Sequence, residues 1–234
     1  MSAADPLDIR AVDTVDERMI DALAELWNGA LPADLAITGA FVRYNVQPSA
    51  GVARRLFVAE VDGALAGAAL ATVLHGEPSV NSHGEGWIDL MAVAPAHRRR
   101  GLGRALLAAA EAWLAGQGCA QASIGAGPRP FTPGLPDPTD AAPFFAACRY
   151  ESGGTAWDMA SNLAGYTPPD VVREIAGVVR PASPRHADDL LAFLRREFPW
   201  PLALRGRSVP GRRRSSLRLH ATMDGAGAST AAAC

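Results

Sequence analysis

The sequence contains no lysine, only three cysteines and no apolar run long enough to cross a membrane. The cysteines, Cys119, Cys148 and Cys234, are odd in number, widely spaced and free of any Cys-x-x-Cys pair. This pattern argues against a disulfide framework and against a zinc site, and we expect no bound metal. Residues 1–8 lack the basic-then-apolar order of a secretion signal. We therefore expect a cytoplasmic protein with no membrane partner.

Charge is distributed unevenly along the chain. Because lysine is absent, all 22 basic side chains other than histidine are arginines, against 24 acids. Residues 205–234 carry six arginines and one acid, whereas residues 1–204 carry sixteen arginines and 23 acids. A basic tail can bind nucleic acid, but this one has no interleaved aromatic residues and no known motif. We therefore expect no nucleic-acid partner.

Hydrophobic periodicity predicts an α/β domain. Apolar residues at helical spacing predict helices over residues 16–27, 31–44, 101–116 and 141–147. Apolar runs predict strands over residues 7–12, 56–61, 64–74, 87–93, 122–125, 150–155 and 156–163. Asp62-Gly63 between two of these runs predicts a tight hairpin, because both turn positions need a positive φ. The element order predicts a mixed sheet with an antiparallel hairpin and parallel pairing across at least one helix.

Residues 87–116 combine an apolar strand, a basic turn, two glycines and a long helix, in that order. Gly101 and Gly103 let the backbone approach a ligand closely, and the free N–H groups at a helix start carry partial positive charge. Full positive charges come from Arg98, Arg99, Arg100 and Arg104. Together these features predict a phosphate-binding site. The plainer alternative is a tight turn beside a solvated arginine face.

Two other phosphate-binding motifs fit the same residues poorly. A dinucleotide-binding fold needs a third glycine where this chain has Leu106, and no arginine run should precede the first glycine. A P-loop needs a Gly-Lys-Ser/Thr ending, which a chain without lysine does not have.

Residues 90–103 resemble motif A of the GNAT superfamily of N-acetyltransferases, an apolar strand and Val-x-Pro followed by Gln/Arg-x-x-Gly-x-Gly/Ala. Arg98, Gly101 and Gly103 fill its three key positions. The resemblance implies a GNAT domain over residues 1–165, with a central mixed β-sheet flanked by helices. It also implies acetyl-CoA as co-substrate and direct transfer of the acetyl group to an amine of a small molecule or peptide.

The resemblance assigns the cofactor contacts residue by residue. The backbone of Met91, Ala92 and Val93 would pair with the pantetheine arm. The pyrophosphate would be held by Arg98, Arg99, Arg100, Gly101, Leu102, Gly103 and Arg104.

The groups that would move protons depart from the family pattern. Direct transfer needs a base for the amine and an acid for the departing thiolate. Phe145 occupies the position of the tyrosine that often serves as that acid, and Tyr150 and Cys148 are candidate substitutes. Glu85 and Asp89, beside and on the strand that should line the site, are candidate bases, although each could equally be a solvated strand-edge acid. A weakly catalytic or inactive acyl-CoA-binding, regulatory domain is therefore the alternative function.

The loop over residues 127–138 is rich in proline and glycine, and it resembles a loop that borders the acceptor site in one GNAT subset. Phe131 and Trp87 could wall an apolar acceptor pocket there. A rigid surface loop held by proline is the alternative.

Residues 166–234 are predicted to be a linker, a partial second GNAT-like unit and an arginine-rich irregular tail. A strand over residues 177–182 and a helix over 188–198 repeat the plan of residues 7–27. This resembles the first half of a tandem-GNAT protein whose second copy is truncated, and the tail would be a truncated or frame-shifted remnant. The partial unit could pack on another subunit, which would favour a homodimer.

Overall fold

The computed structural model describes residues 8–49, 51–75, 84–139, 141–157, 164–176, 178–179, 181–197 and 215–222. The chain divides into two compact units, one made of Met1–Ala156 with Ser215–Cys234 and the other of Trp157–Arg214. None of the helices in the described part of the chain is both long and apolar enough to cross a bilayer.

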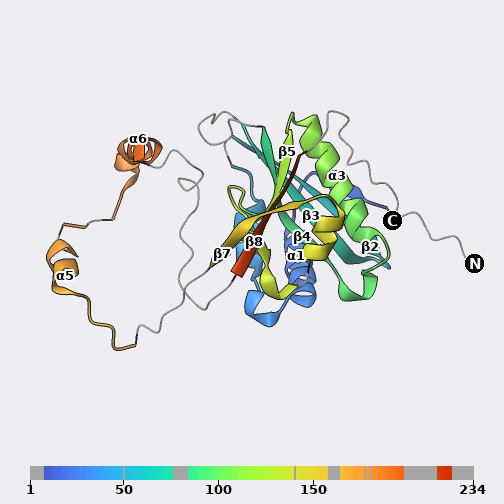
Figure 1. Ribbon diagram of the computed structural model, residues 1–234, viewed down its shortest axis with the longest axis horizontal. Coiled ribbons are helices and arrows are strands. Elements are labelled where there is room, and N and C mark those ends of the chain that lie inside the picture. Colours follow the sequence, from blue (N-terminus) through green and yellow to red (C-terminus); the bar gives the residue numbers. More distant parts are fainter. Residues whose placement is uncertain are drawn as a thin grey trace, which may run out of the picture. The chain divides into compact units, whose positions relative to one another are not determined.

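The first unit is a mixed sheet flanked by helices (Figure 1). Its strands are β1 (Arg10–Val12), β2 (Val52–Val61), β3 (Ala64–Leu74), β4 (Glu85–Val93), β5 (Gln121–Ile124), β6 (Leu135–Pro136), β7 (Glu151–Trp157) and β8 (Ser215–Thr222). Its helices are α1 (Glu17–Ala30), α2 (Gly39–Val46), α3 (Leu102–Gly116) and α4 (Ala142–Ala147), with 3₁₀ turns at Ala33–Leu35, Pro95–His97 and Asp137–Thr139.

The sheet runs in the order β1-β2-β3-β4-β5-β8-β6, and β7 pairs with β8. Strands β4 and β5 are parallel and are joined by α3, while β1 to β4 are antiparallel neighbours. The predicted mixed α/β sheet is therefore confirmed. The β2–β3 hairpin turns at Asp62 and Gly63, whose φ angles of 52° and 78° are both positive, as the Asp-Gly pair predicts.

Local signals set the helix ends. The Asp16 side chain accepts a hydrogen bond from the Met19 amide (2.8 Å) and so caps α1. The helix predicted over residues 31–44 is wrong in its bounds, because a 3₁₀ turn intervenes and α2 begins only at Gly39. The Thr38 side chain caps α2 by accepting a hydrogen bond from the Phe41 amide (3.2 Å). This signal for the start of the helix was missed, because the helix was placed from weak apolar periodicity alone.

The two faces of the sheet bury separate cores. Helix α3 covers one face, where Leu106, Ala110 and Leu114 pack on alternate residues of β3 and β4. Helices α1 and α2 cover the other face, where Leu23 and Val42 pack on the intervening residues. This alternation places consecutive residues of a strand on opposite faces of the sheet, except at a bulge, and it decides what each residue can contact.

Two predictions for the C-terminal region are wrong. Residues 215–222 form β8, antiparallel to β5, where irregular structure was expected. The missed signal is the strict alternation of apolar and polar residues in Leu-Arg-Leu-His-Ala-Thr. In the second unit the described residues of the expected 177–182 strand are not a strand. That unit instead contains α5 (Asp170–Ala176), a 3₁₀ turn at Pro184–His186 and α6 (Ala187–Glu197).

The helix predicted over 188–198 is confirmed by α6. The described residues near 177–182 form no strand, because no neighbouring strand lies beside them to pair with. Most of the strand expected over residues 156–163 lies outside the described residues. The domain bounds at 165 and 166 and the tandem origin stay predictions.

Strand β5 ends at a backbone turn that only glycine fits well. Gly125 has a φ of +66°, and a Cβ there would lie 2.5 Å from the Thr132 carbonyl oxygen. We expect Gly125→Ala to lower the free energy of unfolding by about 2 kcal/mol, measured by urea denaturation, because it adds strain and a backbone clash. Gly29→Ala is the matched control, since a Cβ at Gly29 meets nothing within 4 Å. A Gly125→Ala protein as stable as the control would contradict this reading of the turn.

Candidate functional site

Strand β4 is paired on both edges for only half its length. Its parallel register with β5 runs from Glu85 opposite Gln121 to Ile88 opposite Ile124. Two further bonds follow, from the Gly125 amide to the Ile88 carbonyl (2.8 Å) and from the Phe131 amide to the Asp89 carbonyl (2.9 Å). No register with β5 continues past these residues, whereas β3 stays paired with β4 as far as Val93.

A β-bulge marks the place where the two strands part. On the β3 side, Leu70 faces Leu90 and Ala71 faces Ile88, so Asp89 is the extra residue. A bulge bends its strand and increases the local twist. The bend sends the second half of β4 away from β5 and opens an unpaired strand edge.

The backbone groups on that open edge follow from the ladder. The Ala94 amide donates to the Ala66 carbonyl (2.9 Å), so the alternate residue Ala92 also directs its backbone groups to β3. Met91 and Val93 direct theirs to the open edge. The Val93 carbonyl already accepts from Arg98 Nε (3.1 Å). An extended ligand would therefore find the Met91 N–H, the Met91 carbonyl and the Val93 N–H.

Helix α3 begins beside this edge. Gly101, with a φ of +84°, precedes the helix, and no side chain caps its first turn. The first backbone bond of the helix runs from the Ala105 amide to the Gly101 carbonyl (3.0 Å). The amides of Leu102, Gly103 and Arg104 therefore have no partner within the helix, an arrangement that suits an anion. A Cβ added at Gly103 would lie 3.7 Å from the Met91 Cε atom, so strand edge and helix start adjoin.

The arginines of this turn divide into two kinds. The Arg98 guanidinium donates to two carbonyl groups, that of Val93 and that of Ala30 at the end of α1 (2.6 Å). It ties the end of β4 to α1. Arg99, Arg100 and Arg104 are exposed, and they surround the helix start with positive charge.

Asp89 is the most perturbed carboxyl group in the described part of the chain. Its side chain is buried, and Oδ1 accepts from the Gly127 amide (3.1 Å). Burial raises the pKa of Asp89 to about 6, while Thr72, Arg54 and the Gly127 amide hold that pKa down. The Thr72 hydroxyl acts from close by, although its Oγ1 meets no partner at hydrogen-bond geometry. A carboxyl that titrates near neutrality suits proton transfer.

Gly127 makes the approach of the loop to Asp89 possible. A Cβ at that position would lie 2.3 Å from Oδ1 of Asp89. The loop continues to Arg129, which donates to the Tyr44 carbonyl (2.9 Å) and stacks 4.5 Å from the Tyr44 ring centre. Phe131 is buried against Trp27 and Phe41, with ring centres 5.3 and 5.6 Å apart. The loop is thus anchored on the α1 and α2 face.

Phe131 and Trp87, expected to wall an acceptor pocket, are both buried, with 6% and 3% of their surface exposed. Phe131 belongs to the core under α1 and α2. Arg54, Thr72, Gly127 and Arg129 were missed as site residues. They are scattered over 76 positions of sequence, and the glycine was seen only as a loop former.

Glu85 and Asp89 are not brought together. Glu85 begins β4, and its carboxylate accepts from the Ser123 hydroxyl (2.5 Å). Asp89 lies four positions further along the strand, which is about 13 Å along the sheet. Of the two candidate bases, only Asp89 lies where β4 and β5 part.

Tyr150 is buried beneath α3. Its hydroxyl donates to Oε1 of Glu111 (2.9 Å), and its ring packs on Phe145. Burial first, and then the neighbouring Glu111, raise the pKa of Tyr150 far above its usual range. Its proton is held by a carboxylate in the core, so Tyr150 acts as a link between α3 and β7. Phe145 is itself buried in the same core.

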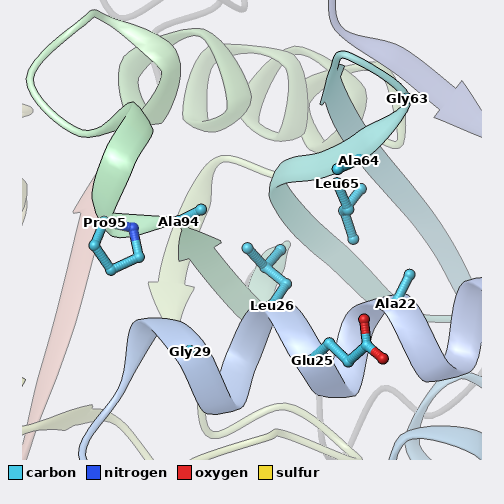
Figure 2. Close-up of a pocket in the computed structure, with 9 residues that line it drawn as sticks. All are labelled: Ala22, Glu25, Leu26, Gly29, Gly63, Ala64, Leu65, Ala94 and Pro95. Atoms are coloured by element: carbon cyan, nitrogen blue, oxygen red, sulfur yellow. The ribbon is translucent and has the colours of Figure 1, made fainter.

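A groove of about 450 Å³ lies elsewhere, between α1 and the β2–β3 turn (Figure 2). Leu26 and Leu65 line it, Ala94 and Pro95 close one end, and Glu25 is its only charged lining residue. A negative charge there opposes binding of a pyrophosphate. The described residues contain no group of three or more His, Cys, Asp or Glu side chains placed to hold a metal ion.

The Tyr150–Glu111 bond is testable as a structural link. Burial raises the pKa of Glu111, while its bond with Tyr150 lowers that pKa. We expect Tyr150→Phe to cost roughly 1–3 kcal/mol, because it leaves a buried carboxylate without its donor. In a double-mutant cycle with Glu111→Gln, chemical denaturation should show that the two changes are strongly non-additive. Additive effects would mean that the bond contributes nothing.

Comparison with known proteins places this geometry in a family. The acetyltransferase (GNAT) family pattern matches residues 20–127, and no curated protein gives a significant match to the chain. A GCN5-related glucosamine N-acetyltransferase region of a fungal multi-domain GH3 β-N-acetylglucosaminidase superposes with a TM-score of 0.66, at 20% identity over 85% of this chain and 24% of that one.

A tandem GNAT protein from the clavulanic acid biosynthesis pathway superposes with a TM-score of 0.51, at 21% identity over 70% of this chain and 52% of that one. The chain thus spans about a quarter of the first protein and about half of the second. At these identities the likeness concerns the fold. Residues 20–127, with the parted strands β4 and β5 and the glycine turn before α3, match the acetyltransferase (GNAT) family pattern.

Proposed function

We propose that the chain is an acetyl-CoA-dependent N-acetyltransferase that passes the acetyl group directly to an amine. The observation that carries the proposal is the junction of the open β4 edge with the uncapped start of α3. The Met91 and Val93 backbone groups suit the amide groups of a pantetheine arm. The free amides at the start of α3, with the exposed Arg99, Arg100 and Arg104, suit the pyrophosphate at its other end.

Between heavy atoms, the transfer makes one nitrogen–carbon bond and breaks one carbon–sulfur bond, and one proton leaves the amine while one is taken up by sulfur. The amine nitrogen attacks the thioester carbonyl carbon, the carbon–sulfur bond breaks, and CoA leaves as a thiolate that takes up a proton. The amine gives up a proton, and Asp89 at the bulge is the base we assign to receive it. Tyr150 is not assigned as the acid, because Glu111 holds its hydroxyl.

An acyl-CoA-binding domain without turnover is the second candidate. The observation that favours it is that Phe145 has no ionisable proton and that Tyr150 is buried in the core with its hydroxyl donating to Glu111, so neither offers a proton at the open edge. Cytoplasmic location, the small-molecule or peptide acceptor and a homodimer also remain proposals.

Cofactor binding is tested most simply at Gly103. The motif admits glycine or alanine at this position, and a Cβ there would lie no closer than 3.4 Å to any neighbour, so the informative change is the bulkier Gly103→Val. We expect it to weaken acetyl-CoA binding at least about tenfold in calorimetry, because its side chain crowds the amides that face the pyrophosphate. Gly116→Val, at the other end of α3 and with nothing within 4 Å of a Cβ, is the control. Equal affinities of the two variants would defeat the cofactor assignment.

The base is tested by Asp89→Asn. We expect kcat/KM to fall roughly 10²–10⁴-fold. In the unaltered chain, kcat/KM should rise with pH through about 6 as Asp89 loses its proton. The charged groups that face Asp89 are Arg54 from β2 and, beyond it, Arg129 from the loop. Neither changes charge in this range.

The same variant should be more stable than the unaltered chain. Because the folded-state pKa of Asp89 is raised, its ionisation opposes folding, and this cost grows from the unfolded pKa up to about pH 6. Asp89→Asn should therefore raise the free energy of unfolding at pH 8 by roughly 2–3 kcal/mol and have little effect at pH 3. A stable but fully active variant would remove Asp89 from the mechanism, and a loss of activity confined to Glu85→Gln would move the base to Glu85.

A further inference from the structure

Four buried side-chain atoms in the described part of the chain lack a hydrogen-bond partner, and all four belong to one cluster. They are Nε and Nη2 of Arg54, Oγ1 of Thr72 and Oδ2 of Asp89. Arg54 on β2 and Thr72 on β3 stand directly opposite each other in the sheet register. Asp89 enters from the bulge of β4, so three adjacent strands aim polar atoms at one place.

Buried polar atoms without hydrogen-bond partners destabilise the fold. A buried polar group without a partner costs roughly 1–3 kcal/mol, and a charged group costs more. Arg54 and Asp89 attract each other, yet among the described residues no ion pair within 4.0 Å joins the two. Arg54 and Asp89 therefore form no ion pair, and each keeps at least one unpartnered buried atom. This arrangement suits a polar ligand that enters between them.

The free edge of Arg54 indicates which ligand group it takes. Its Nη1 is occupied, since it donates to the Gln47 carbonyl (3.2 Å) and to the Ser49 hydroxyl (3.1 Å). The two free nitrogens, Nε and Nη2, form one edge of the guanidinium fork. Two parallel N–H groups on one edge match the two oxygens of a carboxylate.

The net charge of the cluster also favours a carboxylate ligand. Burial lowers the pKa of Arg54, Asp89 raises it, and Arg129 lowers it further, so two guanidinium groups share one carboxylate. Arg129 is already held by Tyr44. The cluster therefore carries one positive charge more than Asp89 offsets, which an incoming anion would balance.

We propose that the acceptor is a primary amine with a carboxylate close to it, as in a free amino acid. The carboxylate lies on the Nε and Nη2 edge of Arg54, and the amine lies at Oδ2 of Asp89. Thr72 completes the contacts with its hydroxyl. The proposal rests on the proposed acetyl transfer and adds the substrate class. A peptide amino terminus lacks this carboxylate and is excluded as the preferred acceptor.

The test compares matched acceptors. Each proteinogenic L-amino acid is assayed beside its α-carboxamide by CoA thiol release from acetyl-CoA. The same pairs are titrated by calorimetry into the full chain loaded with CoA. We expect at least one acid to exceed its amide by at least about tenfold in kcat/KM and in affinity, as for a buried charged contact.

Arg54 should carry that preference. In Arg54→Gln the ratio of acid to amide should fall to about one, and in Arg54→Lys it should be partly retained, because one ammonium replaces the two-donor edge. Arg55→Gln is the matched control. Arg55 is the next residue of β2, points to the opposite face and pairs with Asp13, so its loss should leave the ratio unaltered.

The results that would overturn the amino-acid substrate class differ from those that would overturn acetyl transfer. Turnover of amides or peptide amino termini equal to that of acids would overturn the substrate class while acetyl transfer stands. If the preference for acids persists in Arg54→Gln, Arg54 is not the residue that binds the carboxylate. If no acceptor is turned over, the calorimetric ratio decides, and equal binding of acid and amide, or binding of neither, overturns the proposal.

Discussion

Strand β4 is hydrogen-bonded on both edges as far as Ile88 and on one edge beyond Asp89, and the other features of the site depend on this change. The bulge at Asp89 turns the strand away from β5. The loop that follows β5 covers the start of the opening through its bonds to Ile88 and Asp89. The second half of β4 thereby gains a free backbone edge without exposing a whole strand, and that edge ends at the glycine turn before α3.

The same bulge joins the two halves of the proposed reaction. On one side of the parting lies the strand edge that would hold the pantetheine arm. On the other lies Asp89, buried with Arg54 and Thr72 on the face covered by α1 and α2. Burial both raises the pKa of Asp89 and leaves its Oδ2 unpartnered. A desolvated carboxyl group with an unpartnered oxygen lowers the stability of the fold. Such a loss is expected where function requires a strained or desolvated side chain.

Features with local signals could be predicted from the sequence, and features that depend on distant contacts could not. The Asp62-Gly63 hairpin, the long helix α3 and the glycine turn before it each need only a few neighbouring residues. The bulge at Asp89 depends on the register with β3, and a one-residue shift in a strand has no mark in composition. Tyr150 looked like a spare acid, because its partner Glu111 lies 39 residues away. Arg54 is one of 22 arginines and has no distinguishing signal in the sequence. Its place opposite Thr72 follows only from the register of β2 and β3.

Residue-resolved amide hydrogen exchange with and without acetyl-CoA tests the central claim most directly. Acetyl-CoA should slow exchange at the Met91 and Val93 amides, which face the open edge, and at the Leu102, Gly103 and Arg104 amides at the start of α3. The Ala92 amide between them should change little, because β3 already holds it. Uniform slowing across β4, or no slowing at Met91 and Val93 when acetyl-CoA is bound, would show that the cofactor does not occupy the opening between β4 and β5.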